Sequence, residues 1–181
     1  MKYAATLALL ATIILANWLT TEFGFVAVGF GLTATAGTYA AGVALGLRDV
    51  LQDHASRAWL VGTILVGGAL SYLVADPFIA LASAVAFTVS ELVDWTIYTP
   101  LRGKAAEGTN RWSAAVIGSN LIGAVVDTAI FIGIAFGAAA ISGAMAGQLV
   151  GKFWASLLVV IPFYLVRLVR DRDVSDRLRT S

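Results

Sequence analysis

Several residue types are scarce or missing in this chain of 181 residues. It contains no cysteine and one histidine, and charged residues make up only 13% of it. Without cysteine there can be no disulfide bond, thiolate metal site or thiol nucleophile, and we expect neither a metal nor a cofactor. The net charge of +1 indicates no basic surface for a nucleic acid. Because soluble domains average about 25% charged residues, the low charge also argues against a soluble enzyme.

Long apolar segments take the place of the missing charge. Hydrophobic residues form 59% of the chain, and its mean hydropathy is +0.86. Backbone polar groups find no water in lipid, so segments that cross a bilayer as single passes are helical. Six segments approach or exceed the ~20 residues that span a ~30 Å hydrocarbon core: Tyr3–Leu19, Phe25–Leu47, Ala58–Ala75, Phe78–Thr99, Trp112–Phe136 and Gly147–Val169. The sequence therefore predicts an all-α bundle of six transmembrane helices in residues 1–169 and a charged cytoplasmic tail in residues 170–181.

Positive charge predicts the orientation of these segments. If the N-terminus is inside, all 12 Lys and Arg residues except Lys152 fall in or beside the inner connections. Short loops rich in Lys and Arg stay in the cytoplasm, so both termini are expected there, in a multi-pass protein of the cell (inner or plasma) membrane. The first segment ends without a clear small-x-small cleavage site, so we expect it to be retained rather than removed as a signal peptide.

Local signals indicate where segments begin and end. Asp76-Pro77 should start the fourth segment, because Asp caps a helix and Pro suits its first position. Thr99-Pro100 should end it, since the residue before Pro avoids helical geometry. Residues 48–57 and 101–111 are expected as inner loops, and residues 137–146 as an outer loop or frayed helix end.

Glycine and other small residues mark two further features. Gly29 and Gly31 make the outer end of the second segment a candidate for a non-helical stretch, which membrane proteins tolerate where protein surrounds it. Small residues four apart occur at positions 42 and 46 and at 143, 147 and 151. Such spacing lets helices approach closely, and we favour packing inside the chain over a homodimer interface.

Polar side chains within the predicted helices fall into two layers, because a rise of ~1.5 Å per residue fixes their depth. The outer layer contains Asn17, Asp127, Gln148 and Lys152. The inner layer contains Tyr39, Glu91, Asp94 and Asn120. Ionisable groups inside a membrane are costly and usually functional, so all eight residues are candidate substrate-binding residues.

The two layers permit different interpretations. Asp127 and Lys152 lie at the same predicted depth and form either a structural ion pair or part of a ligand site. Glu91 and Asp94 are one turn apart on one helical face, and no cation is expected at their depth, which favours a ligand or ion site. An aspartic protease is disfavoured, because Asp94 and Asp127 are ~15 Å apart in depth and a shared-proton dyad needs near contact. We therefore assign no catalytic residue.

Three stretches taken together resemble the queuosine-precursor transporter family, also called the vitamin uptake transporter family. Residues 82–94 (ASAVAFTVSELVD) resemble its fourth-helix signature, and residues 118–131 (GSNLIGAVVDTAIF) resemble its fifth-helix signature. Residues 147–152 (GQLVGK) resemble its sixth-helix segment with the lysine, and Asn17-Trp18 also fits. Many members carry Gln where this chain has Glu91, and several have an acidic residue in the second helix where this chain has small residues around Tyr39.

The resemblance implies uptake of 7-cyano-7-deazaguanine or its aminomethyl relative. Such a base presents N1–H and an exocyclic NH₂, which one carboxylate, Glu91 by this interpretation, accepts together. Its carbonyl suits Asn120, Gln148 or Lys152, and its flat ring suits a stack on an aromatic side chain. An alternative is the substrate-capturing subunit of an energy-coupling complex with a cytoplasmic ATPase module. A non-transporting structural membrane protein is the remaining alternative, and the buried charges argue against it.

Overall fold

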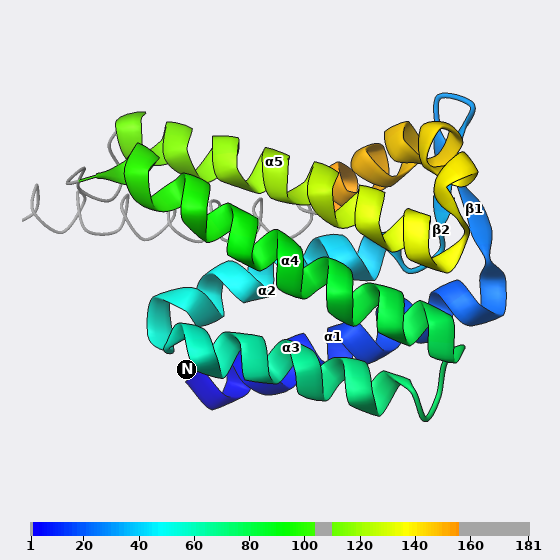
Figure 1. Ribbon diagram of the computed structural model, residues 1–181, viewed down its shortest axis with the longest axis horizontal. Helices are drawn as coiled ribbons and strands as arrows, with labels where there is room; N and C mark the ends of the chain where they lie inside the picture. The colour runs from blue at the N-terminus through cyan, green and yellow to red at the C-terminus, as the bar shows by residue number, and fades with distance from the viewer. Residues whose placement is uncertain (1, 104–109, 156–181) are drawn as a thin grey trace, which may run out of the picture.

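The structure, a computed structural model, describes residues 2–103 and 110–155. Within these ranges the chain forms a helical bundle with one β-hairpin (Figure 1). The elements are α1 (Lys2–Phe23), β1 (Phe25–Gly29), β2 (Leu32–Thr35), α2 (Thr38–His54), α3 (Arg57–Ser71), α4 (Pro77–Arg102), α5 (Asn110–Ala135) and the 3₁₀ turn η1 (Ala138–Ala140). Residues 141–155 are also helical. Six helices are thus confirmed, while the predicted tail at 170–181 lies outside the described residues.

The hairpin is the main departure from the all-α prediction. β1 and β2 pair antiparallel, with Phe25 opposite Thr35 and Ala27 opposite Thr33. The turn between them has positive φ at Gly29 (97°) and Gly31 (72°), a conformation that glycine adopts without steric cost. The expected non-helical stretch is therefore confirmed, but the prediction of one helix over Phe25–Leu47 is wrong.

The hairpin shifts the second helix along the chain. α2 begins at Thr38 and ends at His54, so the prediction that residues 48–57 form an inner loop is wrong for most of that range. The connection to α3 is short, and Ser56 caps α3 by accepting a hydrogen bond from the backbone N–H of Trp59 at 3.3 Å. Arg48 consequently lies inside a helix rather than in a loop.

The ends of the later helices agree only in part with the predictions. Asp76 caps α4 as expected, since its Oδ1 accepts hydrogen bonds from the backbone N–H groups of Phe78 (2.8 Å) and Ile79 (3.2 Å). α4 nevertheless continues through Pro100 to Arg102, because a proline in the last turn removes only one backbone hydrogen bond. The last described helix begins at residue 141, inside the stretch expected to be an outer loop or frayed end.

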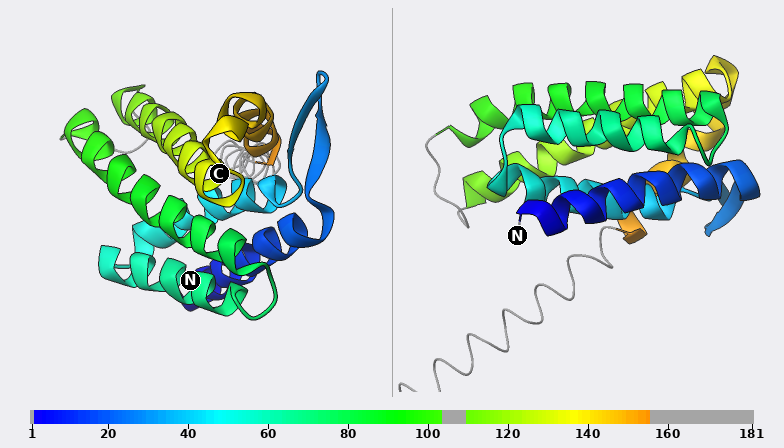
Figure 2. Two further views of the ribbon diagram at one scale, coloured as in Figure 1. Left: turned by 45° about the vertical axis from the view of Figure 1, so that its right-hand side comes forward. Right: turned by 90° about the horizontal axis from the view of Figure 1, so that it is seen from below.

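The helices pack side by side around a small apolar core. α4 lies along α5, and α1 contacts both α2 and α3 (Figures 1 and 2). The buried apolar cluster joins these elements and contains Ala5, Leu9, Ile13, Ala44, Leu51, Leu60, Ile64 and Phe87. Because Phe87 belongs to this cluster, the core extends to the middle of α4.

Close helix packing occurs at the predicted small residues. A Cβ on Gly147 would lie 1.8 Å from the carbonyl oxygen of Thr33, and one on Gly151 would lie 2.7 Å from Thr38 Cγ2. A Cβ on Gly42 would lie 2.5 Å from that of Ala155. These three glycines therefore serve packing within the chain, as predicted, and they hold the last described helix against the hairpin and α2.

The outer surface of the bundle is apolar. Among the described residues, the helical stretches Lys2–Phe23 and Pro77–Ile97 are long and apolar enough to cross a membrane. Shorter apolar helices occupy Arg57–Ser71 and Leu121–Ala135. Leu7 (67%), Phe78 (67%) and Leu121 (61%) are largely exposed. An apolar exterior on several helices suits a lipid environment.

Candidate functional site

The inner polar layer contains a buried arginine that the sequence interpretation did not place there. Arg48 on α2 is 1% exposed. Its Nε lies 3.4 Å from Glu91 Oε2, and its Nη2 lies 3.8 Å from Asp94 Oδ1. The prediction that no cation shares the depth of these carboxylates is therefore wrong, because α2 starts late and carries Arg48 into the bundle.

This arginine changes the interpretation of the inner layer. A buried carboxylate is costly unless it is paired, and Arg48 supplies positive charge to both Glu91 and Asp94. The two pairs thus join α2 to α4, and Arg48 offsets one of the two buried negative charges. We call Arg48, Glu91 and Asp94 the inner ion cluster.

The other two residues predicted for the inner layer do not add a described contact there. Tyr39 lies in the first turn of α2 and is 36% exposed, about 13 Å along the helix from Arg48. Its assignment to the inner layer is wrong, because the helix begins 13 positions later than predicted. Asn120 lies on α5, but its side chain is outside the described part, so its role stays a prediction.

The outer layer contains the predicted ion pair. Lys152 Nζ donates to Asp127 Oδ2 and, at 2.8 Å, to Thr128 Oγ1. Asp127 and Lys152 are 4% and 5% exposed. The prediction that these two residues meet is confirmed, and the pair joins α5 to the helix over residues 141–155.

Beside this pair, Gln148 forms a ring of hydrogen bonds with two threonines. The Thr38 hydroxyl donates to Gln148 Oε1, and Gln148 Nε2 donates to Thr35 Oγ1 at 2.8 Å. The two threonine hydroxyls are 3.1 Å apart. Because a hydroxyl has one proton and that of Thr38 is already donated, Thr35 donates to Thr38 and closes the ring. β2, α2 and the last described helix are thereby tied together.

A small cavity lies between the ion pair and this ring. Its volume is about 30 Å³, enough for roughly two water molecules. All four residues predicted for the outer layer line it, namely Asn17, Asp127, Gln148 and Lys152. The lining also includes side chains that the sequence interpretation missed, namely Thr20, Thr35, Thr38, Ser83, Phe87 and Phe131. The cavity thus combines a carboxylate, an ammonium, two amides, hydroxyls and two aromatic rings.

One amide in the cavity wall lacks a hydrogen-bond partner. Asn17 is 2% exposed, and its Nδ2 donates to no atom of the described residues. Its surroundings are tightly built, since a Cβ on Gly37 would lie 2.0 Å from the carbonyl oxygen of Ala16. The Gly37 N–H also donates to Thr20 Oγ1 at 3.2 Å. Buried polar groups normally have partners, so this amide is an exception that requires a reason.

The late start of α2 explains why Thr35, Thr38 and Arg48 were missed. The stretch from residue 25 to 35 has a glycine-containing turn between two short runs, which is a hairpin signal. A hairpin there would have placed Thr35 and Thr38 at the outer end of α2 and Arg48 near its middle. Hydropathy alone gave no such indication, because the hairpin is as apolar as a helix.

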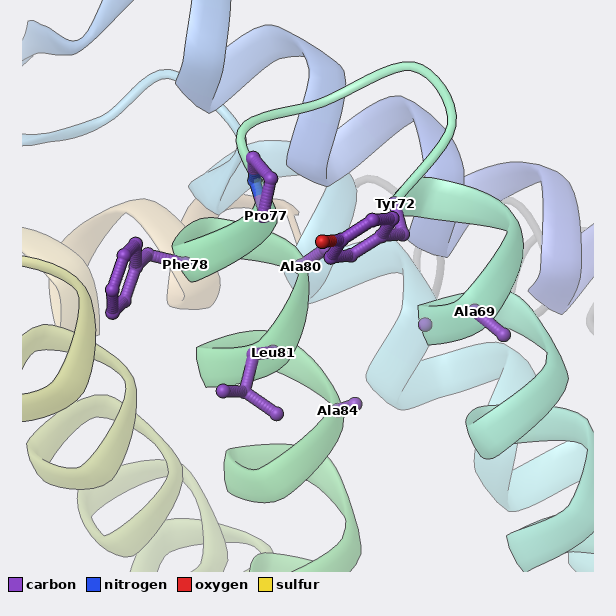
Figure 3. A pocket seen from close by; sticks show the side chains of 8 residues that line it. Ala69, Tyr72, Pro77, Phe78, Ala80, Leu81 and Ala84 are labelled. Carbon is purple, nitrogen blue, oxygen red and sulfur yellow. The ribbon is translucent and has the colours of Figure 1, made fainter.

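A larger groove lies elsewhere and has a different character. Its volume is about 630 Å³, and it lies between the end of α3 and the start of α4. Its walls are apolar apart from the hydroxyl of Tyr72 (Figure 3). The other lining residues are Gly68, Ala69, Pro77, Phe78, Ala80, Leu81 and Ala84. With no charged or amide group, it offers no means of recognising a polar ligand, and the smaller cavity is the candidate site.

Comparison with known proteins gives one result. The family model described as "Putative vitamin uptake transporter" matches residues 3–166. No curated protein and no solved structure matches the chain. The family match covers α1 to the last described helix, including every side chain of the cavity. The chain therefore belongs to the putative vitamin uptake transporter family.

Proposed function

We propose that this protein is a multi-pass membrane transporter that takes up a 7-deazaguanine queuosine precursor. The substrate is 7-cyano-7-deazaguanine or its aminomethyl relative, and it binds in the cavity around Asp127, Gln148 and Lys152. Membership of a transporter family implies a small-molecule substrate and a membrane context. The observation that carries the proposal is the cavity itself, which places paired charges, amides and aromatic rings inside an apolar bundle.

The cavity contains groups that match a guanine-like base. N1–H and the exocyclic NH₂ are parallel donors that one carboxylate accepts together, and Asp127 is the carboxylate in the described lining. The ring carbonyl suits Lys152, whose ammonium has three N–H donors and uses two on Asp127 and Thr128. Phe87 and Phe131 supply rings for stacking. Asp127 belongs to the lining of the cavity and Glu91 does not, so Asp127 replaces Glu91 as the proposed reader of the donor pair.

The described conformation is closed around this site. Pockets for small ligands measure roughly 300–1,000 Å³, whereas this cavity measures about 30 Å³. A base can enter only if the wall elements separate, and transport requires separation toward each side in turn. The inner ion cluster lies about 15 Å along α2 from Thr38. We propose that it stabilises the closed conformation by holding α2 against α4 on the inner side of the cavity.

The proposed orientation places both termini in the cytoplasm. Lys2 Nζ lies 3.7 Å from the Trp59 ring centroid, and Arg57 lies 3.8 Å from that of Trp95. Tryptophan is typical of either membrane interface, and an excess of Lys and Arg at one end of a bundle indicates the cytoplasmic side. A cysteine placed at Gly143 should be labelled by an impermeant reagent from outside, and one at Lys104 should not. The reverse labelling pattern would contradict the orientation.

Uptake into proteoliposomes tests the substrate. The purified protein should accumulate a labelled 7-deazaguanine, and guanine-like compounds should compete far better than adenine-like ones, because unpaired buried groups reject analogues. Imposed pH gradients would show whether protons drive uptake. Asp127→Asn should abolish uptake, whereas Asp76→Asn makes the same chemical change at an exposed helix cap and should leave it intact. Binding without uptake, with an ATPase module copurifying, would instead indicate the substrate-capturing subunit of an energy-coupling complex.

A further inference from the structure

We propose that Asn17 determines which deazaguanine the cavity accepts, by donating from Nδ2 to an uncharged acceptor on the seven-position substituent. The site would thus bind the cyano compound and exclude the ammonium of its aminomethyl relative. This inference rests on the proposed function and deepens it. It depends on the unpartnered amide of Asn17, which the proposal of transport did not use, and on the charges in the cavity.

The first observation is the state of the Asn17 amide. Its nitrogen is buried and has no hydrogen-bond partner in the described part of the chain, yet it belongs to the cavity wall. A buried donor without a partner destabilises a protein. A leucine, which has the same number of side-chain heavy atoms, would avoid that cost, so an asparagine here makes sense if a ligand completes the hydrogen bond.

The second observation is that Asn17 is held in place. Thr20 lies one turn further along α1 and accepts the hydrogen bond from the Gly37 N–H at 3.2 Å. The backbones of α1 and the start of α2 meet so closely that a Cβ on Gly37 would overlap the Ala16 carbonyl. α1 cannot rotate Asn17 away without breaking this contact, so the backbone that carries the amide is fixed in the wall.

The third observation concerns charge. Asp127 and Lys152 neutralise each other, and the described cavity lining contains no second carboxylate. An ammonium on the ligand would compete with Lys152 for Asp127 and leave one positive charge without a partner in a buried space. A nitrile nitrogen is neutral and only accepts, so it complements the Asn17 donor. Rotation of the amide could offer Oδ1 to an ammonium, but it could not supply the missing negative charge.

Binding measurements on the full-length protein in nanodiscs test this inference. The probes are 7-cyano-7-deazaguanine, its aminomethyl relative, and 7-deazaguanine without the substituent. The wild type should bind the cyano compound at least roughly tenfold more tightly than either other probe, the effect of one good hydrogen bond. Asn17→Leu should remove the advantage over the unsubstituted base, while the melting temperature of the ligand-free protein stays equal or rises.

A second variant tests whether the preference for the cyano compound over the aminomethyl compound can be reversed. Asn17→Asp supplies the carboxylate that an ammonium lacks in the wild type, so it should bind the aminomethyl compound more tightly than the cyano compound. If this variant does not fold, the binding of the three probes to the wild type and to Asn17→Leu is sufficient to test the inference. Equal binding of all three probes by the wild type, or an unchanged cyano advantage in Asn17→Leu, would overturn the inference while leaving transport standing. If no probe binds, the proposed substrate fails, and this inference fails with it.

Discussion

Removing the charge of Asp127 alone should destabilise the protein more than removing the charges of Asp127 and Lys152 together. Asp127→Asn and Lys152→Met each keep nearly the same side-chain volume, so charge is the main change. Each single variant leaves one buried charge without its partner, because both side chains are only 6% exposed. The double variant leaves none.

The structure predicts which of these variants loses the most free energy of unfolding. Loss of one partner of a buried pair costs about 3–5 kcal/mol. Lys152 keeps its 2.8 Å hydrogen bond to Thr128 in Asp127→Asn, and the new amide oxygen can still accept, so about 3 kcal/mol is expected. Lys152→Met leaves Asp127 without its cation, so about 5 kcal/mol is expected. The double variant should lose less than either single variant, and so far less than the sum of about 8 kcal/mol, because no unpaired charge stays buried.

Thermal denaturation in detergent, followed by size exclusion, measures these losses. For a chain of this size 1 kcal/mol corresponds to about 2–4 °C, so each single variant should melt at least roughly 6 °C below the wild type. The double variant should melt above both single variants. Strictly additive shifts would show that the two side chains act separately and would refute the assignment of a coupled buried pair.

Two further changes test the packing and the inner ion cluster by the same melting assay. Arg48→Met leaves both α4 carboxylates without this cation and should lower the free energy of unfolding by about 3–5 kcal/mol. Arg48→Lys keeps the charge and should lower it less. If the two variants lose the same stability, the positive charge of Arg48 does not contribute to it. Gly147→Ala should prevent normal folding, because its Cβ would lie 1.8 Å from a backbone oxygen of β2. Gly143→Ala in the same helix meets nothing within 4 Å and should gain up to about 1 kcal/mol.

The pairing in the outer layer was predictable from the sequence in part because α5, which carries Asp127, begins close to its predicted position. α5 and α4 begin within a few residues of the predicted positions, so the constant rise per residue fixes the depth of their polar groups. The helix that carries Lys152 begins at residue 141 rather than 147, so the match of Asp127 with Lys152 also depends on how this helix packs against α5. The resemblance to a transporter family, which the same side chains carry, is also correct.

The inner layer was misjudged because hydropathy does not distinguish a buried hairpin from a buried helix. Because Phe25 was taken as the start of a helix, every later residue of that helix was predicted too far toward the inner side. Arg48 was then assigned to a loop, and Tyr39 was assigned to the depth that Arg48 actually occupies. The unpaired state of Asn17 could not be foreseen at all, since it depends on side chains from several other elements that meet at the cavity.

The position of the hairpin also affects how much protein lies on each side of the cavity along the path of a transported solute. In the described part of the chain, each strand of the sheet has one edge without a strand partner, and backbone groups of this kind are not tolerated where they face lipid. In the proposed membrane orientation, β1 and β2 would lie at the membrane–water boundary, with the cavity, built on Thr35 and Thr38, just beneath it. From there to Arg48 the path runs about 15 Å through the packed core. A solute entering from the hairpin side meets a thin barrier and then a thick one, so the slow step of uptake should be release at the far end.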